Sequence, residues 1–347
     1  MYNQYMERCI ELARMGLGHV APNPLVGALL VYDEKIIGEG YHQQYGEAHA
    51  EVNAINAVSK EHQHLISKST LYVSLEPCSH FGKTPPCSDL ILKNKIPKVV
   101  IGCTDTFKEV SGQGIINLRE AGVDVIVGML EQECRLLNKR FFTFHEKKRP
   151  YIILKWAQTI NGLISSSSAE DDKWISNIYS KKLVHKWRSE ESAIMVGTNT
   201  ALNDNPQLTV REWTGKNPIR IVIDKTLRLP AHLYLFDQSV PTIVFTEKDQ
   251  KNRENLKYEK IDFNTNSIDA IMERLHQLNI QSVLVEGGSY LLKCFIDKGL
   301  WDEARVLTGT KTFREGIPAP TINGTLISKD NLHGDTLLVY QNRGSGK

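Results

Sequence analysis

Three residues of the types that zinc prefers occur in two short segments. His49 stands two residues before Glu51 at the start of a predicted helix, and Cys78 and Cys87 follow a predicted buried strand with eight residues between them. One imidazole and two thiolates supply three ligands and leave the fourth tetrahedral position open for water, as in catalytic zinc sites. The segments therefore predict a catalytic Zn²⁺ held by His49, Cys78 and Cys87.

Glu51 is the candidate catalytic residue beside this site. Zinc lowers the pKa of a bound water towards about 7, and a carboxylate that is not a ligand can then move protons between water, ring nitrogen and leaving amine. Zinc deaminases share the pattern His-x-Glu followed by Pro-Cys-x-x-Cys. The chain matches it at His49, Glu51 and Pro77-Cys78 and departs in the longer insert before Cys87. We expect hydrolytic removal of an exocyclic amine from a nucleobase-like ring, the alternative being packed thiols or a purely structural zinc site.

The elements that position these residues alternate between strands and helices. Apolar runs predict strands at 26–32, 36–40, 71–75, 98–102 and 123–128, and apolar periodicity predicts helices at 6–17, 50–58, 90–93 and 114–121. Buried strands that alternate with helices are typical of an α/β fold.

Composition narrows the classes of partner and location. The 347 residues carry a formal net charge of +2 without a basic stripe or tail, so we expect a small-molecule substrate and no nucleic acid. The chain has no apolar run long enough to span a membrane and opens without a signal-peptide pattern. Six scattered cysteines do not resemble a disulfide framework, which predicts a reducing, cytoplasmic location.

A second α/β series begins after a charged stretch at 139–150 that we interpret as a solvated linker. Its predicted strands are 151–155, 193–196, 219–224, 242–246, 282–286, 303–307 and 336–340, and its predicted helices are 180–189, 268–278 and 289–297. A chain of this length accommodates two domains, which we place at 1–146 and 147–347.

Gly287, Gly288 and Ser289 join a buried strand to a helix in this second series. Paired glycines allow a close backbone approach, and a helix N-terminus offers free amide donors, so this turn is a candidate phosphate-binding loop. A tight structural turn is the alternative interpretation. The Gly-x-Gly-x-x-Gly pattern of Rossmann domains does not follow the first strand.

Segments 21–27, 46–51 and 76–87 together resemble the bifunctional riboflavin-biosynthesis deaminase/reductase family, and the long insert between the cysteines is the most discriminating feature. The resemblance spans almost the whole chain. It implies a cytidine-deaminase-like three-layer domain followed by a dihydrofolate-reductase-like domain, both α/β. It also implies zinc-dependent deamination of 2,5-diamino-6-ribosylamino-4(3H)-pyrimidinone 5′-phosphate, followed by reduction of the ribosyl chain with NADPH.

The resemblance also implies roles for single residues. In the deaminase half, the expected substrate contacts are Asn23, His42, His80 and Lys83, the last two facing the 5′-phosphate. In the reductase half, the expected NADPH contacts are Ala157, Trp174, Thr200, Asp204, Gly287, Gly288 and Ser289, and the expected substrate contacts are Arg188, Leu208, Arg211 and Glu286. Two arginines suit a phosphate dianion through charge-assisted hydrogen bonds. The residues themselves identify neither the proton donor for reduction nor a reader of the NADPH 2′-phosphate.

Two departures from the family pattern concern the reductase half. Asn161 stands where the family has an aspartate, and the loop 165–172 ends in three acidic residues. One alternative is therefore a deaminase whose second domain has lost catalysis. The others are a deaminase of nucleosides or RNA and a zinc-stabilised binding protein without activity. We also expect a homo-oligomer.

Overall fold

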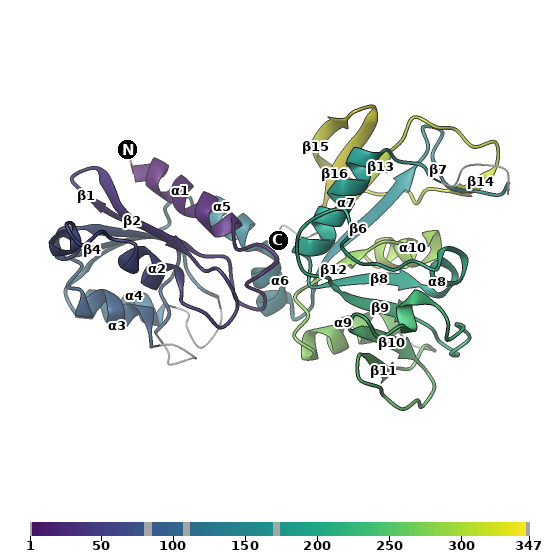
Figure 1. The fold of residues 1–347 in the computed structure, drawn as a ribbon, viewed down its shortest axis with the longest axis horizontal. Helices are drawn as coiled ribbons and strands as arrows, with labels where there is room; N and C mark the ends of the chain where they lie inside the picture. Colours follow the sequence, from purple (N-terminus) through teal and green to yellow (C-terminus); the bar gives the residue numbers. More distant parts are fainter. Residues whose placement is uncertain (1, 80–84, 107–111, 169–173, 265, 345–347) are drawn as a thin grey trace. The chain divides into compact units, whose positions relative to one another are not determined.

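The computed structural model describes residues 2–79, 85–106, 112–168, 174–264 and 266–344 (Figure 1). The chain divides into two compact units, residues 1–148 and 149–347. None of the helices in the described ranges is both long and apolar enough to cross a bilayer.

The first unit contains a five-stranded sheet in the order β2-β1-β3-β4-β5. Strands β3, β4 and β5 run parallel, whereas β1 pairs antiparallel with both β2 and β3. The bounds are β1 Gly27–Tyr32, β2 Lys35–Tyr41, β3 Thr70–Leu75, β4 Lys98–Cys103 and β5 Asp124–Val127. The apolar runs of β1, β3 and β4 are buried almost throughout because helices cover both faces of the sheet.

Helices form the two outer layers of this unit (Figure 1). One face is covered by α2 (Ala50–Asn56), α3 (Cys87–Lys93) and α4 (Gln113–Glu120), and the other by α1 (Tyr2–Arg14), α5 (Glu131–Leu137) and α6 (Lys139–Lys147). A short 3-10 helix spans Gln63–Lys68. The expected three-layer α/β domain is confirmed.

The charged stretch at 139–150 is not a solvated linker, and that prediction was wrong. Residues 139–147 form helix α6, which buries Phe141, Phe142 and Phe144. Phe141 and Phe142 pack in the same core cluster as residues of α1 and α5. The apolar aromatic face therefore makes this segment an amphipathic helix despite its many charges. Arg149 then pairs with Asp302 at 2.6 Å, and both side chains are largely buried.

The second unit contains a nine-stranded sheet in the order β11-β10-β9-β8-β12-β6-β13-β16-β15. All neighbours from β11 to β13 run parallel, and β16 and β15 extend the sheet antiparallel. The bounds are β6 Tyr151–Gln158, β8 Ala193–Gly197, β9 Ile219–Ile223, β10 Thr242–Thr246, β11 Leu256–Lys260, β12 Ser282–Val285, β13 Glu303–Thr308, β15 Gly324–Leu332 and β16 Asp335–Asn342. A separate two-stranded sheet pairs β7 (Leu163–Ser166) with β14 (Gly316–Pro318).

Helices again cover both faces of the larger sheet. Helices α9 (Ser267–Gln277) and α10 (Ser289–Asp297) pack on one side, and α7 (Ile178–Glu190) packs on the other. The short helix α8 (Thr198–Asp204) follows β8, and a 3-10 turn spans Tyr234–Phe236. Because β9, β8, β12 and β6 are parallel, the residues that follow them gather at one edge of the sheet.

Candidate functional site

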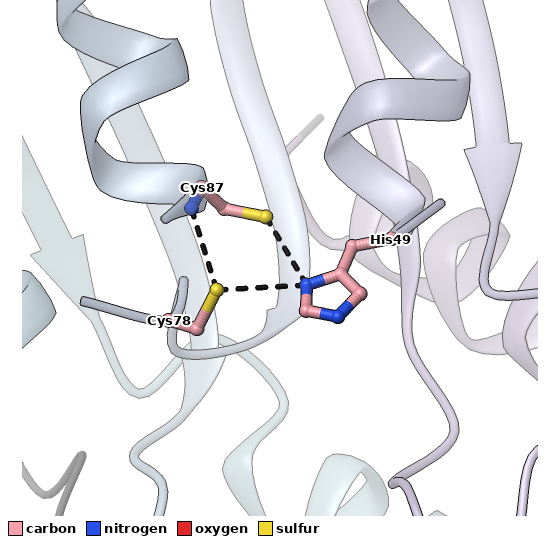
Figure 2. Close-up of side chains that lie close together, drawn as sticks. All are labelled: His49, Cys78 and Cys87. Atoms are coloured by element: carbon pink, nitrogen blue, oxygen red, sulfur yellow. Dashed lines mark hydrogen bonds between the residues drawn. The ribbon is translucent and has the colours of Figure 1, made fainter. Parts of the chain in front are cut away.

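His49, Cys78 and Cys87 converge on one point in the first unit (Figure 2). His49 immediately precedes α2, Cys87 begins α3, and Cys78 lies in the loop after β3. The Nδ1 atom of His49 lies 3.5 Å from Sγ of Cys78 and 3.3 Å from Sγ of Cys87. All three ligand atoms lie within 4.8 Å of one another, so they fit a single zinc ion with a fourth position left open.

The electrostatics of this cluster favour a thiolate at Cys78, whereas the hydrogen bond with Cys78 and burial raise the pKa of the Cys87 thiol. A hydrogen bond from Cys87, followed by the contact with His49, lowers the pKa of the Cys78 thiol to about 4. The backbone N–H of Cys87 also donates to Sγ of Cys78 at 3.3 Å. Metal binding requires deprotonated cysteines, so Cys78 is ready to bind a cation, and Cys87 would give up its proton when the metal binds.

Glu51 lies two residues beyond the ligand His49, in the first turn of α2, and is 3% exposed. Burial, reinforced by the negative charge of Cys78, raises the pKa of Glu51 to about 7. A carboxyl group with this pKa exchanges protons readily near neutral pH, which suits a general acid/base.

Asn23 and His42 form a hydrogen-bonded pair near the metal ligands. The Nδ1 of His42 lies 3.0 Å from the carbonyl oxygen of Ala48, which can only accept, so Nδ1 carries the proton. The Nε2 atom therefore accepts from the side-chain amide of Asn23 at 3.0 Å. The ring of His42 also meets that of His49 edge-on, with centroids 5.4 Å apart. His42 thus orients Asn23, a role more specific than the expected substrate contact.

Glu76 is a residue of this region that sequence reasoning missed. Its buried carboxylate accepts the backbone N–H groups of Asp105, Gly112 and Gly114 at 3.0–3.2 Å. It stands two residues before Cys78 and ties the zinc-ligand loop to the start of α4. An acidic residue at the end of an otherwise apolar strand is the signal that points to it. His80 and Lys83, expected to meet the substrate phosphate, lie outside the described residues.

The second unit contains a cleft of about 960 Å³ at the edge of the sheet where its parallel strands end. Ten of the residues expected to contact NADPH or substrate line it: Ala157, Trp174, Arg188, Thr200, Asp204, Arg211, Glu286, Gly287, Gly288 and Ser289. Leu208 does not line it. The side chain of Leu208 is 2% exposed and packs in the core against α8 and β9.

In the turn from β12 into α10, the backbone packs closely against the side chain of Thr200. A Cβ atom at Gly287 would lie 3.2 Å from the side chain of Thr200, and one at Gly288 would lie 3.0 Å from it. Gly288 also has a φ of +54°, a conformation that favours glycine. The nine-residue helix α10 then begins at Ser289. Its free backbone N–H groups fit the pyrophosphate of a dinucleotide.

Glu286 directly follows β12, and its side chain, 6% exposed, lies between two cations. Its carboxylate accepts from Nε and Nη2 of Arg188, both at 2.8 Å, and lies 3.8 Å from Nζ of Lys155. Burial opposes ionisation, yet Arg188 and Lys155 hold the pKa of Glu286 at about 2. Because Glu286 occupies the guanidinium fork of Arg188, this arginine positions a carboxylate rather than offering its fork to a phosphate.

Lys155 and His185 are cleft residues that were not assigned a role from sequence. Burial lowers the pKa of Lys155, while the charge of Glu286 opposes that shift. Burial and the charges of Arg188 and Arg211 lower the pKa of His185 to about 4, and its Nδ1 accepts the backbone N–H of Arg211 at 3.0 Å. The sequence signal for Lys155 is its position as a charged residue within the otherwise apolar strand β6.

Asn161 lies in the turn between β6 and β7. Its amide donates to the carbonyl of Phe313 at 2.8 Å and accepts from the hydroxyl of Thr159 at 2.7 Å. An ionised aspartate would lack the first of these bonds, so the amide suits this turn. The acidic residues 170–172 lie outside the described part of the chain.

Comparisons with known proteins match each of the two units to a protein family. Residues 1–103 match the zinc-binding region of cytidine and deoxycytidylate deaminases, and residues 150–322 match the RibD C-terminal domain. The riboflavin biosynthesis protein RibD of Aquifex aeolicus is 40% identical over 90% of this chain and 88% of its own length, and that of Escherichia coli is 34% identical over 88% and 87%.

Solved structures extend the likeness to the fold. A diaminohydroxyphosphoribosylaminopyrimidine deaminase/5-amino-6-(5-phosphoribosylamino)uracil reductase from Thermotoga maritima is 38% identical, with a TM-score of 0.89 and 98% of each chain covered. RibD of Acinetobacter baumannii is 29% identical, with a TM-score of 0.87 and the same coverage. This chain belongs to the RibD family of riboflavin biosynthesis enzymes, with a zinc-binding deaminase domain followed by a reductase domain.

Proposed function

We propose that the chain catalyses two consecutive steps. The first is deamination of 2,5-diamino-6-ribosylamino-4(3H)-pyrimidinone 5′-phosphate, and the second is reduction of the ribosyl chain with NADPH to give 5-amino-6-(5-phosphoribitylamino)uracil. The observation that carries this proposal is the presence in one chain of the His49, Cys78 and Cys87 cluster and of a dinucleotide-sized cleft. Family matches in both halves favour two activities over a deaminase alone.

In the deaminase unit, bound zinc supplies hydroxide near neutral pH. Glu51 takes the proton of the attacking water and delivers it to the ring nitrogen and then to the leaving amine, which departs as ammonia. The pKa of about 7 for Glu51 matches that double role. Asn23, held by His42, presents its amide to the edge of the pyrimidine ring.

In the reductase unit, bound NADPH would supply the hydride for reduction of C1′ of the opened, imine-like sugar, and the adjacent nitrogen would need a proton. Gly287, Gly288 and Ser289 hold the cofactor pyrophosphate. Arg211, whose Nη1 donates to the hydroxyl of Thr209, binds the substrate phosphate.

Lys155 supplies the proton for the reduction. Glu286, with a pKa of about 2, remains ionised at neutral pH and has no proton to give. His185, with a pKa of about 4, is neutral and uses Nδ1 as an acceptor. Lys155 lines the cleft with a side chain that is 14% exposed and a lowered pKa, and a lysine in that state releases a proton more readily than one in water.

A coupled assay on the purified chain tests both steps. With the pyrimidinone phosphate alone, ammonia should be released. On addition of NADPH, its oxidation should follow in equal amount. Ammonia release without NADPH oxidation would leave only the deaminase, and release from cytidine or RNA but not from this substrate would identify another deaminase. A chain with no activity would be a zinc-stabilised binding protein. Metal analysis should find about one zinc per chain.

The remaining expectations concern assembly and location. We propose a cytoplasmic homo-oligomer that acts on small phosphorylated pyrimidines and binds neither nucleic acid nor membranes. Light scattering after size exclusion measures the oligomeric state, and an electrophoretic shift assay with RNA tests for nucleic-acid binding.

A further inference from the structure

Six cationic side chains line the cleft of the second unit, and most are matched by a carboxylate. Lys155 and Arg188 share Glu286, Lys181 pairs with Glu212, and Lys293 pairs with Asp297. Among the cleft residues in the described ranges, Arg211 and Arg228 have no carboxylate within ion-pair distance. These two arginines are therefore the cations available to anionic groups of ligands.

The two arginines serve different parts of the cleft. Arg211 donates its backbone N–H to Nδ1 of His185. The positive charge of Arg188, which binds Glu286 after β12, lowers the pKa of Arg211, so Arg211 belongs to the Glu286 side of the cleft. Arg228 follows β9, and its Nη2 donates to Oδ1 of Asn199, which follows β8, at 2.7 Å. In the sheet order β9-β8-β12-β6, Arg228 stands at the β9 end of this edge. Three strand spacings of about 4.8 Å place that end roughly 14 Å from the strand of Lys155.

A dinucleotide bound along this edge has only one suitable direction. Its nicotinamide has to reach the substrate beside Lys155 and Glu286, and its pyrophosphate fits the turn at Gly287 and Gly288. The adenosine ribose then extends over the ends of β8 and β9, beside Asn199 and Arg228. NADPH differs from NADH by a 2′-phosphate on this ribose.

We propose that Arg228, oriented by Asn199, binds the 2′-phosphate of the cofactor and makes the reductase prefer NADPH over NADH. This inference rests on the proposed reductase function. It names a residue that recognises the 2′-phosphate of NADPH, which the sequence alone does not identify.

The loop that carries Arg228 is held by neighbouring hydrogen bonds. The carboxylate of Asp224, 1% exposed, accepts the backbone N–H groups of Arg228 and Leu229 at 3.1 and 3.0 Å. The hydroxyl of Thr198 donates to the carbonyl of Ile223 and so joins the start of α8 to the end of β9.

The guanidinium of Arg228 is also suited to a phosphate. Within the described residues, its only side-chain hydrogen bond is the one from Nη2 to Asn199, so Nε and Nη1 remain for a ligand. Arginine presents these donors in a rigid fork that matches phosphate oxygens. The side chain is exposed at the cleft, so a ligand can reach it.

The substitution Arg228→Gln tests the proposal because it keeps a polar side chain and removes the charge. The KM for NADPH should rise about 10- to 100-fold, the loss expected for a hydrogen-bonded charge pair, while the KM for NADH should change less than about twofold. Arg228→Lys should restore part of the NADPH affinity. Calorimetry provides a readout without turnover: the wild type should bind adenosine 2′,5′-bisphosphate more tightly than adenosine 5′-monophosphate, and Arg228→Gln should remove that difference.

Arg253→Gln is the matched control, since Arg253 is exposed on the same unit and does not line the cleft. It should leave both KM values and both binding constants unchanged. An equal rise in the KM for NADPH and the KM for NADH in Arg228→Gln would mean that Arg228 only stabilises the loop, and it would overturn the proposal. No change in either KM would also overturn it. If the wild type oxidises neither cofactor, the reductase function itself fails, and the calorimetric comparison still decides whether Arg228 reads a 2′-phosphate.

Discussion

The side-chain amide of Asn23 donates to Nε2 of His42 at 3.0 Å, and this bond fixes which way the amide faces. His42 is 2% exposed, burial lowers its pKa, and its other nitrogen is engaged by Ala48. The neutral ring therefore acts as a fixed acceptor, and Asn23 offers its oxygen and one remaining N–H to a ligand.

If His42 acts through Asn23, the two residues should behave as one unit. His42→Ala and Asn23→Ala should each raise the KM for the pyrimidinone phosphate about tenfold without loss of zinc, and the double variant should be little worse than either. Steady-state kinetics and metal analysis measure this. His64→Ala, at an exposed position, is the control. Additive effects in the double variant would show that the residues act independently.

Glu51→Gln should abolish deamination without emptying the zinc site. General acid/base catalysis contributes about 10²- to 10⁴-fold, and the amide can neither take nor deliver the proton. Ammonia release should fall by that factor, while NADPH oxidation with the deaminated product should be unchanged. The exposed Glu120→Gln serves as control. Retained ammonia release would remove Glu51 from the mechanism.

Removal of zinc should separate the two activities. The ligands His49, Cys78 and Cys87 belong to the first unit, and the residues that line the reductase cleft belong to the second. After treatment with a chelator, ammonia release should stop and NADPH oxidation with the deaminated product should continue. Loss of both rates would mean that the second unit depends on the metal.

Glu76→Gln should loosen the zinc site without touching a ligand. The amide has one acceptor oxygen where the carboxylate bonds three backbone N–H groups. Loss of such support around a ligand lowers metal affinity by about 10- to 100-fold. Competition with a chromogenic chelator measures the affinity. An unchanged affinity together with a lower Tm would restrict Glu76 to a structural role.

The ion pair around Glu286 makes the stability of the second unit depend on pH. The pKa of Glu286 is lowered from 4.5 to about 2, so its stabilising contribution is present in full above 4.5 and is lost as the pH falls towards 2. Glu286→Gln leaves Arg188 and Lys155 without a counter-charge and should cost about 3–5 kcal/mol. Urea unfolding of wild type and variant at pH 7 and pH 3 tests this. The difference between them should shrink at the lower pH.

Lys155→Met should slow reduction about 10²- to 10⁴-fold, the range expected for loss of a general acid. Binding of adenosine 2′,5′-bisphosphate should persist, because the turn proposed to bind phosphate precedes α10 and does not belong to β6, which carries Lys155. Calorimetry and NADPH oxidation give the two readouts. Lys216→Met, exposed and away from the cleft, is the control. A normal reduction rate in Lys155→Met would require a different proton donor.

The parts predicted well from sequence are those that depend on local pattern. The zinc ligands could be identified because His49, Cys78 and Cys87 are rare residue types at the ends of apolar elements. The buried strands were predicted because apolar runs in a parallel sheet are nearly continuous. The exposed edge strand β15 has no such run and was missed.

The remaining features depend on contacts between residues far apart in the chain. Arg188 and Glu286 are 98 positions apart, so their pairing, and with it the role of Arg188, is invisible to local analysis. The same holds for Glu76, whose partners lie beyond the next strand. In α6 the flanking charges concealed the aromatic face of Phe141 and Phe142.

The order of residues at the end of β12 has one further consequence. Glu286 is joined directly to Gly287, so a single peptide bond separates the carboxylate that holds Arg188 and Lys155 from the turn proposed to bind the cofactor. A shift of this strand end would displace both ligands together instead of pulling them apart. Under the proposed function, the covalent link between Glu286 and Gly287 would therefore help to fix the spacing between hydride donor and acceptor.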